Sequence, residues 1–308
     1  MVVNLENIND TIKQLEHVFG PLEILRKISK NNLSLLLKDK NQTKYILKLF
    51  DMENNSEFQN EYIANKYLSK INYKYIPNLI IKLNNALLYK YENFYQNFDV
   101  IIQKSIDQKL FECKLFLYEN FIIDILINFQ KLNRISKKID AFTYIKQKNL
   151  CYKFKLNNAL ENSKITTNFY YQFVSFINLI AEAQYPFGVF THGDFNFANI
   201  LANLDLSNYL IIDWEYSDHS NRNRDYATFF MYIFFILKNK KLSLFMIELL
   251  SKFDDYIPNL FIYFILLNSL IWMNFSELSD MPIKFCSYLE DNKLISDMNF
   301  IKCINALL

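Results

Sequence analysis

Three polar side chains near residue 200 have the types and spacing that phosphoryl transfer from a metal-bound nucleotide requires. Asp194 is followed by Asn199 five residues later, and Asp213 comes fourteen residues after Asn199, directly after the apolar residues 210–212. A loop carboxylate can act on an attacking hydroxyl, and an amide and a second carboxylate can hold Mg²⁺ against the phosphates. Each residue alone is also typical of an ordinary turn or strand end. Their combination favours the catalytic interpretation.

The segment around these residues resembles the choline/ethanolamine kinase branch of the aminoglycoside phosphotransferase and protein-kinase-like superfamily. The resemblance rests on the pattern HGDxxxxN at residues 192–199 and the pattern IIDWEY at residues 211–216. It continues through Asn-Arg-Asn-Arg-Asp-Tyr-Ala at residues 221–227. The residues themselves match the family only over 191–227. Over the rest of the chain, the resemblance is limited to the predicted order of helices and strands.

This resemblance implies a role for each matching residue. Asp194 is expected to act as the catalytic base or to orient the acceptor, and His192 to orient the loop. Asn199 and Asp213 are expected to bind Mg²⁺, and Glu215 to lie toward the acceptor. ATP and Mg²⁺ are therefore the expected cofactors.

Upstream, Lys48 and Glu61 resemble the lysine and helix glutamate of kinases. Lys48 alternates with apolar neighbours in the predicted strand 45–50, and Glu61 lies on the helix predicted to follow. In kinases the lysine neutralises charge on the α- and β-phosphates, and the glutamate holds its ammonium in place. A strand lysine taken alone is usually solvated, but the order and spacing favour the functional interpretation.

The loop expected to cover the phosphates departs from the family pattern. The family usually builds this loop with glycine, whereas residues 29–34 of this chain read SKNNLS. Asparagine tolerates a positive φ better than most residues, so the turn can still form. Ser29 and Asn32 are the predicted nucleotide contacts here.

Choline is the favoured acceptor. A quaternary ammonium cannot donate a hydrogen bond, so its site should offer aromatic faces and a nearby carboxylate. Trp272 and Phe275 are three residues apart on a predicted helix and resemble the paired tryptophans of the family, and Tyr216 would add another wall. Because 17% of the residues are aromatic, core packing of this pair remains an alternative. Asp254, Asp255 and Glu277 are further acidic candidates.

Two other functions stay open. The same fold and loop would serve a kinase for ethanolamine, thiamine, a sugar or an aminoglycoside. Because the predicted phosphate loop lacks glycine, the second alternative is a protein that binds a nucleotide but does not catalyse phosphoryl transfer.

The periodicity of the chain predicts an α+β, two-lobed, protein-kinase-like fold. A helix over residues 4–19 precedes a hairpin of strands at 33–37 and 45–50, and a helix over 57–71 precedes strands at 79–81 and 86–91. These elements predict a small antiparallel-sheet N-lobe over residues 1–92. The C-lobe, residues 93–308, should be larger and mostly helical, with short strands between residues 189 and 214.

The charge balance and the apolar stretches of the sequence bear on two possible partners, nucleic acid and a membrane. The 308 residues carry 34 basic and 32 acidic side chains, interleaved to a formal net charge of +2, so no nucleic-acid partner is expected. Residues 226–237 are too short to cross a bilayer, and residues 257–273 are marginal and interrupted by polar residues. Both stretches predict buried helices, and we expect no membrane span.

The cysteines and the first residues favour a cytoplasmic protein. The four cysteines lack the paired spacing of a zinc site, which predicts buried free thiols in a reducing compartment. Residues 1–10 lack the basic and apolar regions of a secretory signal. The oligomeric state stays open.

Overall fold

The computed structural model describes residues 5–27, 33–51, 55–91, 96–132, 156–182, 189–272 and 282–286. The chain divides into two compact units, and each is described by itself. The first unit combines Met1–Ile101 with Ala198–Ser217, and the second combines Ile102–Phe197 with Asp218–Leu308. The boundary predicted near residue 92 lies among residues 92–95, outside the described part of the chain.

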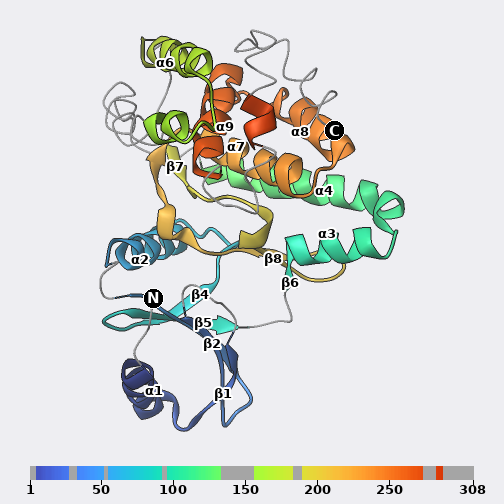
Figure 1. Cartoon of the computed structure of the whole chain (residues 1–308). Coiled ribbons are helices and arrows are strands. Elements are labelled where there is room, and N and C mark those ends of the chain that lie inside the picture. The colour runs from blue at the N-terminus through green and yellow to red at the C-terminus, as the bar shows by residue number, and fades with distance from the viewer. Residues whose placement is uncertain are drawn as a thin grey trace. The chain divides into compact units, whose positions relative to one another are not determined.

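The first unit is built on a five-stranded antiparallel sheet (Figure 1). Its strand order is β1-β2-β3-β5-β4, and a helix precedes β1 and another follows β3. The bounds are α1 Leu5–Phe19, β1 Leu22–Lys27, β2 Leu33–Asp39, β3 Lys44–Leu49, α2 Asn55–Lys70, β4 Asn78–Lys82 and β5 Ala86–Tyr91. The predicted α+β class is confirmed. Strand β1 was not predicted, because its residues are mostly exposed and show no alternation of burial.

Alternation along the central strands gives the sheet two apolar faces. Leu47 and Leu49 of β3 pack with Ile12 and Leu15 of α1 in one cluster. On the other face, Leu87 and Tyr89 of β5 pack with Phe50 and Phe58, the latter from α2. Since successive side chains of a strand point to opposite faces, Lys48 lies on the face toward α2.

A short hairpin completes the first unit. Strands β8 (Ile200–Ala202) and β9 (Tyr209–Ile211) pair antiparallel, with Ile200 opposite Ile211, and β6 (Gln96–Asn97) pairs with β8. The ring of Tyr209 stacks on Tyr75 at 4.4 Å, and the backbone N–H of Ile211 donates to the carbonyl of Tyr75 (2.7 Å). The hairpin is therefore fixed to the loop that follows α2.

The second unit is mostly helical (Figure 1). Its helices are α3 Phe98–Asp107, which begins in the first unit, α4 Phe111–Gln130, α6 Thr167–Glu182, α7 Asn223–Met231, α8 Lys240–Leu250 and α9 Pro258–Trp272. A π-helical turn, Tyr232–Ile236, continues α7, and β7 (Val189–Thr191) pairs with β10 (Asp218–Ser220). Helix α7 packs on α9, so the two apolar stretches predicted as buried helices form adjacent parts of this core.

The structure also bears on the expectations for membrane-spanning helices and for the cysteines. Within the described part of the chain, no helix is long and apolar enough to cross a membrane. Of the two described cysteines, neither is in a disulfide; Cys286 is buried, as expected, but Cys113 is exposed. The expectation of a buried thiol was wrong for Cys113, because the buried residues of α4 are those on its opposite face, such as Phe111, Tyr118 and Ile122. Cys151 and Cys303 lie outside the described residues.

Candidate active site

The ammonium of Lys48 lies at the centre of a buried ionic cluster in the first unit. It donates to Glu61 Oε2 at 2.5 Å, to Glu215 Oε2 at 3.0 Å, and to Asp213 Oδ1. Lys48 and Glu61 are 8% and 3% exposed. The structure thus brings together Lys48, Glu61 and Asp213, three residues predicted at the nucleotide site, and their role in binding nucleotide stays a prediction.

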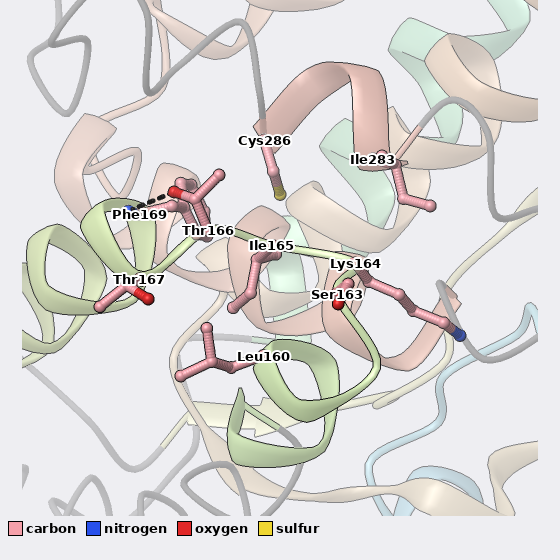
Figure 2. Close-up of a pocket in the computed structure, with 9 residues that line it drawn as sticks. All are labelled: Leu160, Ser163, Lys164, Ile165, Thr166, Thr167, Phe169, Ile283 and Cys286. Atoms are coloured by element: carbon pink, nitrogen blue, oxygen red, sulfur yellow. Dashed lines mark hydrogen bonds between the residues drawn. The ribbon is translucent and has the colours of Figure 1, made fainter.

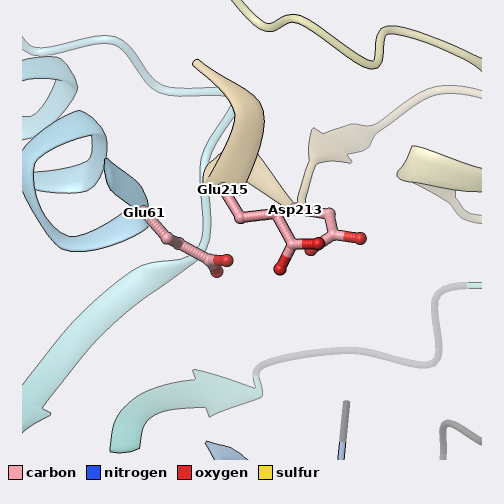
Figure 3. Close-up of side chains that lie close together, drawn as sticks. All are labelled: Glu61, Asp213 and Glu215. Atoms are coloured by element: carbon pink, nitrogen blue, oxygen red, sulfur yellow. The ribbon is translucent and has the colours of Figure 1, made fainter. Parts of the chain in front are cut away.

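Local structure explains why these side chains converge. Lys48 faces α2, which carries Glu61 toward the sheet. After β9, a 3₁₀ turn, Trp214–Tyr216, packs on α2. Buried Trp214 donates its indole N–H to the carbonyl of Ile211 (3.0 Å), which fixes the turn. Figure 3 shows the Glu61 side chain pointing from α2 toward the carboxylates of Glu215 and Asp213.

Asp213 has an uncommon backbone conformation. Its φ is +68°, in the left-handed region that non-glycine residues seldom adopt. Such conformations cost about 1–3 kcal/mol and cluster at functional sites. Here the positive φ turns the chain sharply between β9 and the 3₁₀ turn, and it delivers the Asp213 carboxylate to Lys48.

The cluster holds more negative than positive charge. Burial alone would lower the pKa of Lys48, but the charges of Glu61, Asp213 and Glu215 outweigh burial and raise that pKa, so the ammonium stays charged. Burial raises the pKa of Glu215 to about 7, against the opposing effect of Lys48. Three carboxylates facing one ammonium create a strong local preference for additional positive charge.

The oxygen donors of this cluster suit Mg²⁺, which prefers carboxylate and amide oxygens. Oxygens of Glu61, Asp213 and Glu215 lie within 4.8 Å of one another. Asn199 ends the 3₁₀ turn Phe197–Asn199 directly before β8, and the backbone N–H of Ile212 donates to its carbonyl at 2.9 Å. The two predicted metal ligands, Asn199 and Asp213, therefore lie on adjacent chain segments.

The loop with His192 and Asp194 is held from within the second unit. The backbone N–H groups of His192 and Gly193 donate to the two carboxylate oxygens of Asp225, at 3.0 and 2.9 Å. Asp225 is fully buried in the first turn of α7, and burial raises its pKa against the neighbouring charge of Arg222. Asn196 donates to Asp194 Oδ1 at 3.0 Å. The segment 221–227 was noted in the sequence, but the anchoring role of Asp225 was not predicted.

The predicted acceptor residues are described only in part. Glu215 is buried and bonded to Lys48, and Tyr216 is 48% exposed, with its hydroxyl 3.5 Å from Glu57 Oε1. Trp272 is the last residue of α9, and its side chain lies outside the described part of the structure. Phe275, Ser29, Asn32 and Glu277 also lie outside the described residues.

The other acidic candidates lie in the second unit. Asp255 accepts hydrogen bonds from the hydroxyl of Tyr226 at 2.9 Å and from Gln130 at 3.1 Å. Its backbone carbonyl accepts from Asn223 at 2.9 Å, which ties the segment before α9 to α7. Asp254 is exposed. The contacts of Asp255 are those of a residue that joins helices.

A separate hollow of about 500 Å³ opens beside the N-terminus of α6 (Figure 2). The hydroxyl of Thr166 caps this helix by accepting from the N–H of Phe169 at 3.1 Å. The lining residues are Leu160, Ser163, Lys164, Ile165, Thr166, Thr167, Phe169, Ile283 and Cys286. None of these nine is a carboxylate or a histidine, so the described lining lacks the base and the metal ligands of phosphoryl transfer.

No protein-family model and no curated protein sequence matches the chain. Solved structures do match its fold. Choline kinase LicA from Streptococcus pneumoniae is 16% identical, with a TM-score of 0.59 over 98% of this chain and 99% of that chain. An ethanolamine kinase from Plasmodium vivax is 17% identical, with a TM-score of 0.56 over 100% of this chain and 89% of that chain.

The likeness extends to antibiotic kinases. A GDP complex of aminoglycoside 2'-phosphotransferase-IIIa is 10% identical, with a TM-score of 0.61 over 95% of this chain and 100% of that chain. At these identities the comparisons show the fold. The chain therefore has the kinase-like fold that choline, ethanolamine and aminoglycoside kinases share.

Proposed function

We propose that the protein is an ATP-dependent phosphotransferase that moves the γ-phosphate onto the hydroxyl of a small alcohol, with choline as the favoured acceptor. One observation carries the proposal: the ammonium of Lys48 is paired with Glu61 at 2.5 Å and also bonded to Asp213. A lysine fixed by a helix glutamate beside a metal-binding carboxylate is the arrangement that kinases use for nucleotide phosphates.

Each residue then has a part in the reaction. Glu61 holds Lys48, whose ammonium would bind the α- and β-phosphates, and Asn199 and Asp213 would hold the ion. Mg²⁺, when bound, supplies positive charge that stabilises the charge developing on the phosphates. Asp194 would accept the proton of the acceptor hydroxyl, with Asp225 holding the backbone of its loop in place.

The solved structures of similar fold support a nucleotide and a small acceptor. Among them are the choline kinase in complex with AMP and aminoglycoside phosphotransferases bound to GDP and ADP. Choline is favoured because Glu215 and Tyr216 follow Asp213 in the order typical of choline kinases. Trp272 and Phe275 would supply aromatic faces for its quaternary ammonium.

Mg²⁺-dependent ADP production by the purified protein tests the proposal. Choline, ethanolamine, thiamine, glucosamine and an aminoglycoside would each be offered as acceptor, with Asp213→Asn as a control for a contaminating kinase. We expect ADP production that depends on choline and is lost in Asp213→Asn. ADP production with another acceptor would show that choline is not the acceptor and would leave the kinase function in place. Absence of Mg·ATP binding would overturn the kinase function itself.

A further inference from the structure

We propose that Tyr89 is a positioning residue of this site, because its hydroxyl fixes one oxygen of Glu61 so that the other meets Lys48. The inference deepens the proposed kinase function and rests on it for its consequence in ATP binding. Tyr89 was not among the residues that the sequence singled out.

The geometry assigns a different partner to each oxygen of Glu61. The hydroxyl of Tyr89 donates to Oε1 at 2.7 Å, and Lys48 donates to Oε2 at 2.5 Å. Tyr89 and Glu61 are 5% and 3% exposed. A carboxylate with both oxygens held by buried donors cannot rotate without breaking one of these bonds. The hydroxyl thereby restricts the direction in which Glu61 pulls the ammonium.

Asn65 determines which way the Tyr89 hydroxyl points. Its side-chain amide lies one helical turn after Glu61 and donates to the Glu61 backbone carbonyl at 2.9 Å and to the Tyr89 oxygen at 3.3 Å. A tyrosine hydroxyl has one hydrogen to give. Since its oxygen accepts from Asn65, that hydrogen is directed at Glu61.

The sheet places Tyr89 where this contact is possible. In β5, Leu87 lies opposite Lys48 and Tyr89 lies opposite Ile46, so these side chains share the face toward α2. The ring of Tyr89 packs in the apolar cluster with Phe50, Phe58 and Leu87. Burial, together with the charge of Glu61, raises the pKa of Tyr89 well above its usual value, so the phenol keeps its proton.

Tyr45 offers a matched control on the same sheet. It is buried on the opposite face, in β3, and its hydroxyl donates to Asp39 Oδ2 at 3.0 Å. Tyr89→Phe and Tyr45→Phe therefore each remove one buried hydroxyl that donates to a carboxylate. Of the two, only the hydroxyl of Tyr89 contacts Glu61.

The deciding measurement uses the full chain without nucleotide. Lys48 is modified with an amine-reactive acetylating reagent, and its rate is followed by peptide mass spectrometry. A less constrained Glu61 holds the ammonium in place for a smaller fraction of the time, so Lys48 is exposed to the reagent more often. We expect acetylation of Lys48 to be at least about threefold faster in Tyr89→Phe and unchanged in Tyr45→Phe. In a Glu61→Ala background, Tyr89→Phe should have no further effect.

The dissociation constant for Mg·ATP provides the functional readout. We expect Tyr89→Phe to raise it by about tenfold, at the lower end for a hydrogen bond to a charged group. Unchanged Lys48 acetylation in Tyr89→Phe, an equal change in Tyr45→Phe, or a persisting effect without Glu61 would overturn the inference. If the unmodified protein binds no Mg·ATP, the proposed function fails, and the acetylation rates still decide whether Tyr89 positions Glu61.

Discussion

Asn199 and Asp213 lie at the same, open end of one antiparallel strand pair, because Asn199 directly precedes β8 and Asp213 is the second residue after β9. The hydrogen bond from the Ile212 N–H to the Asn199 carbonyl extends this pairing. The thirteen residues between the two predicted ligands, residues 200–212, therefore form a short hairpin. The spacing in the sequence has a direct geometric reason.

The first prediction concerns the negative charge of Asp213. Asp213→Asn keeps a residue that tolerates the positive φ of this position, but removes the charge that would hold the ion. Mg²⁺-dependent ATP turnover should fall by at least about a hundredfold, since a catalytic metal contributes several kcal/mol. Asn199→Ala should have a milder effect.

Asp205→Asn is the control on the same hairpin. Asp205 lies in the β8–β9 turn, where it accepts from the N–H and the hydroxyl of Ser207 at 3.1 and 2.9 Å. Its charge is not needed for ion binding, so turnover should stay at the unmodified level. Turnover in Asp213→Asn equal to that of Asp205→Asn would remove Asp213 from the metal site.

The second prediction concerns the charge balance around Lys48. Lys48→Met leaves Glu61 buried without its ammonium, and losing one partner of a buried ion pair costs about 3–5 kcal/mol of unfolding free energy. With the ammonium gone, the carboxylates of Glu61, Asp213 and Glu215 offer a site for a divalent cation. Mg²⁺ should therefore raise the melting temperature of Lys48→Met more than that of the unmodified protein.

Lys38→Met separates this effect from the general loss of a lysine. Lys38 pairs with Glu23 at 2.7 Å, but both side chains are partly exposed, and such a pair contributes at most about 1 kcal/mol. Denaturant unfolding of both variants, with and without Mg²⁺, measures the difference. If both variants lost the same unfolding free energy, the ammonium of Lys48 would not be needed to balance the buried carboxylates.

The third prediction concerns Asp194. Asp194→Asn fills the same space, but an amide cannot accept the proton of the acceptor hydroxyl. The maximal rate should fall by about 10²–10⁴-fold, as is typical of a lost general base, while the dissociation constant for Mg·ATP stays nearly unchanged. Single-turnover kinetics and calorimetric binding would measure the two quantities. A collapse of ATP affinity would instead indicate a structural role.

The fourth prediction concerns Asp225. An asparagine at this position has one oxygen, so it cannot accept from the N–H groups of both His192 and Gly193 with separate oxygens. A buried donor left without a partner costs about 1–3 kcal/mol. Asp225→Asn should lower the unfolding free energy by that amount and also slow turnover, because the loop that carries Asp194 loses its anchor. If Asp225→Asn were less stable but turned over at the normal rate, Asp225 would stabilise the fold without positioning the loop that carries Asp194.

The sequence predicts best where periodicity and local order carry the information. Lys48 and Glu61 could be paired from the sequence because strand alternation and helix order place them on facing surfaces. Tyr89 could not be predicted, because the chain has 21 tyrosines and the contact with Glu61 spans 28 residues. Likewise, only the fold shows that residues 198–217 belong to the first unit, where the 3₁₀ turn Trp214–Tyr216 packs on α2.

The last prediction concerns the acceptor and rests on Trp272 at the end of α9. If its indole faces a trimethylammonium group, a desolvated cation–π contact of about 2 kcal/mol is lost in Trp272→Ala. The Michaelis constant for choline should then rise by at least about tenfold, and Trp272→Phe should recover much of the loss. The Michaelis constant for ATP should stay unchanged.

A core-packing role for Trp272 predicts a different pattern. Phe264 is a buried aromatic residue of the same helix, and Phe264→Leu tests what the loss of an aromatic ring from α9 does to the unit. Packing defects lower the melting temperature and affect both substrates alike, since a lost buried aromatic costs about 3–5 kcal/mol on truncation to alanine. Melting temperatures and both Michaelis constants should be measured on the same preparations. A choline effect that exceeds the ATP effect in Trp272→Ala, but not in Phe264→Leu, would place Trp272 at the acceptor, whereas parallel shifts in both variants would make it part of the core.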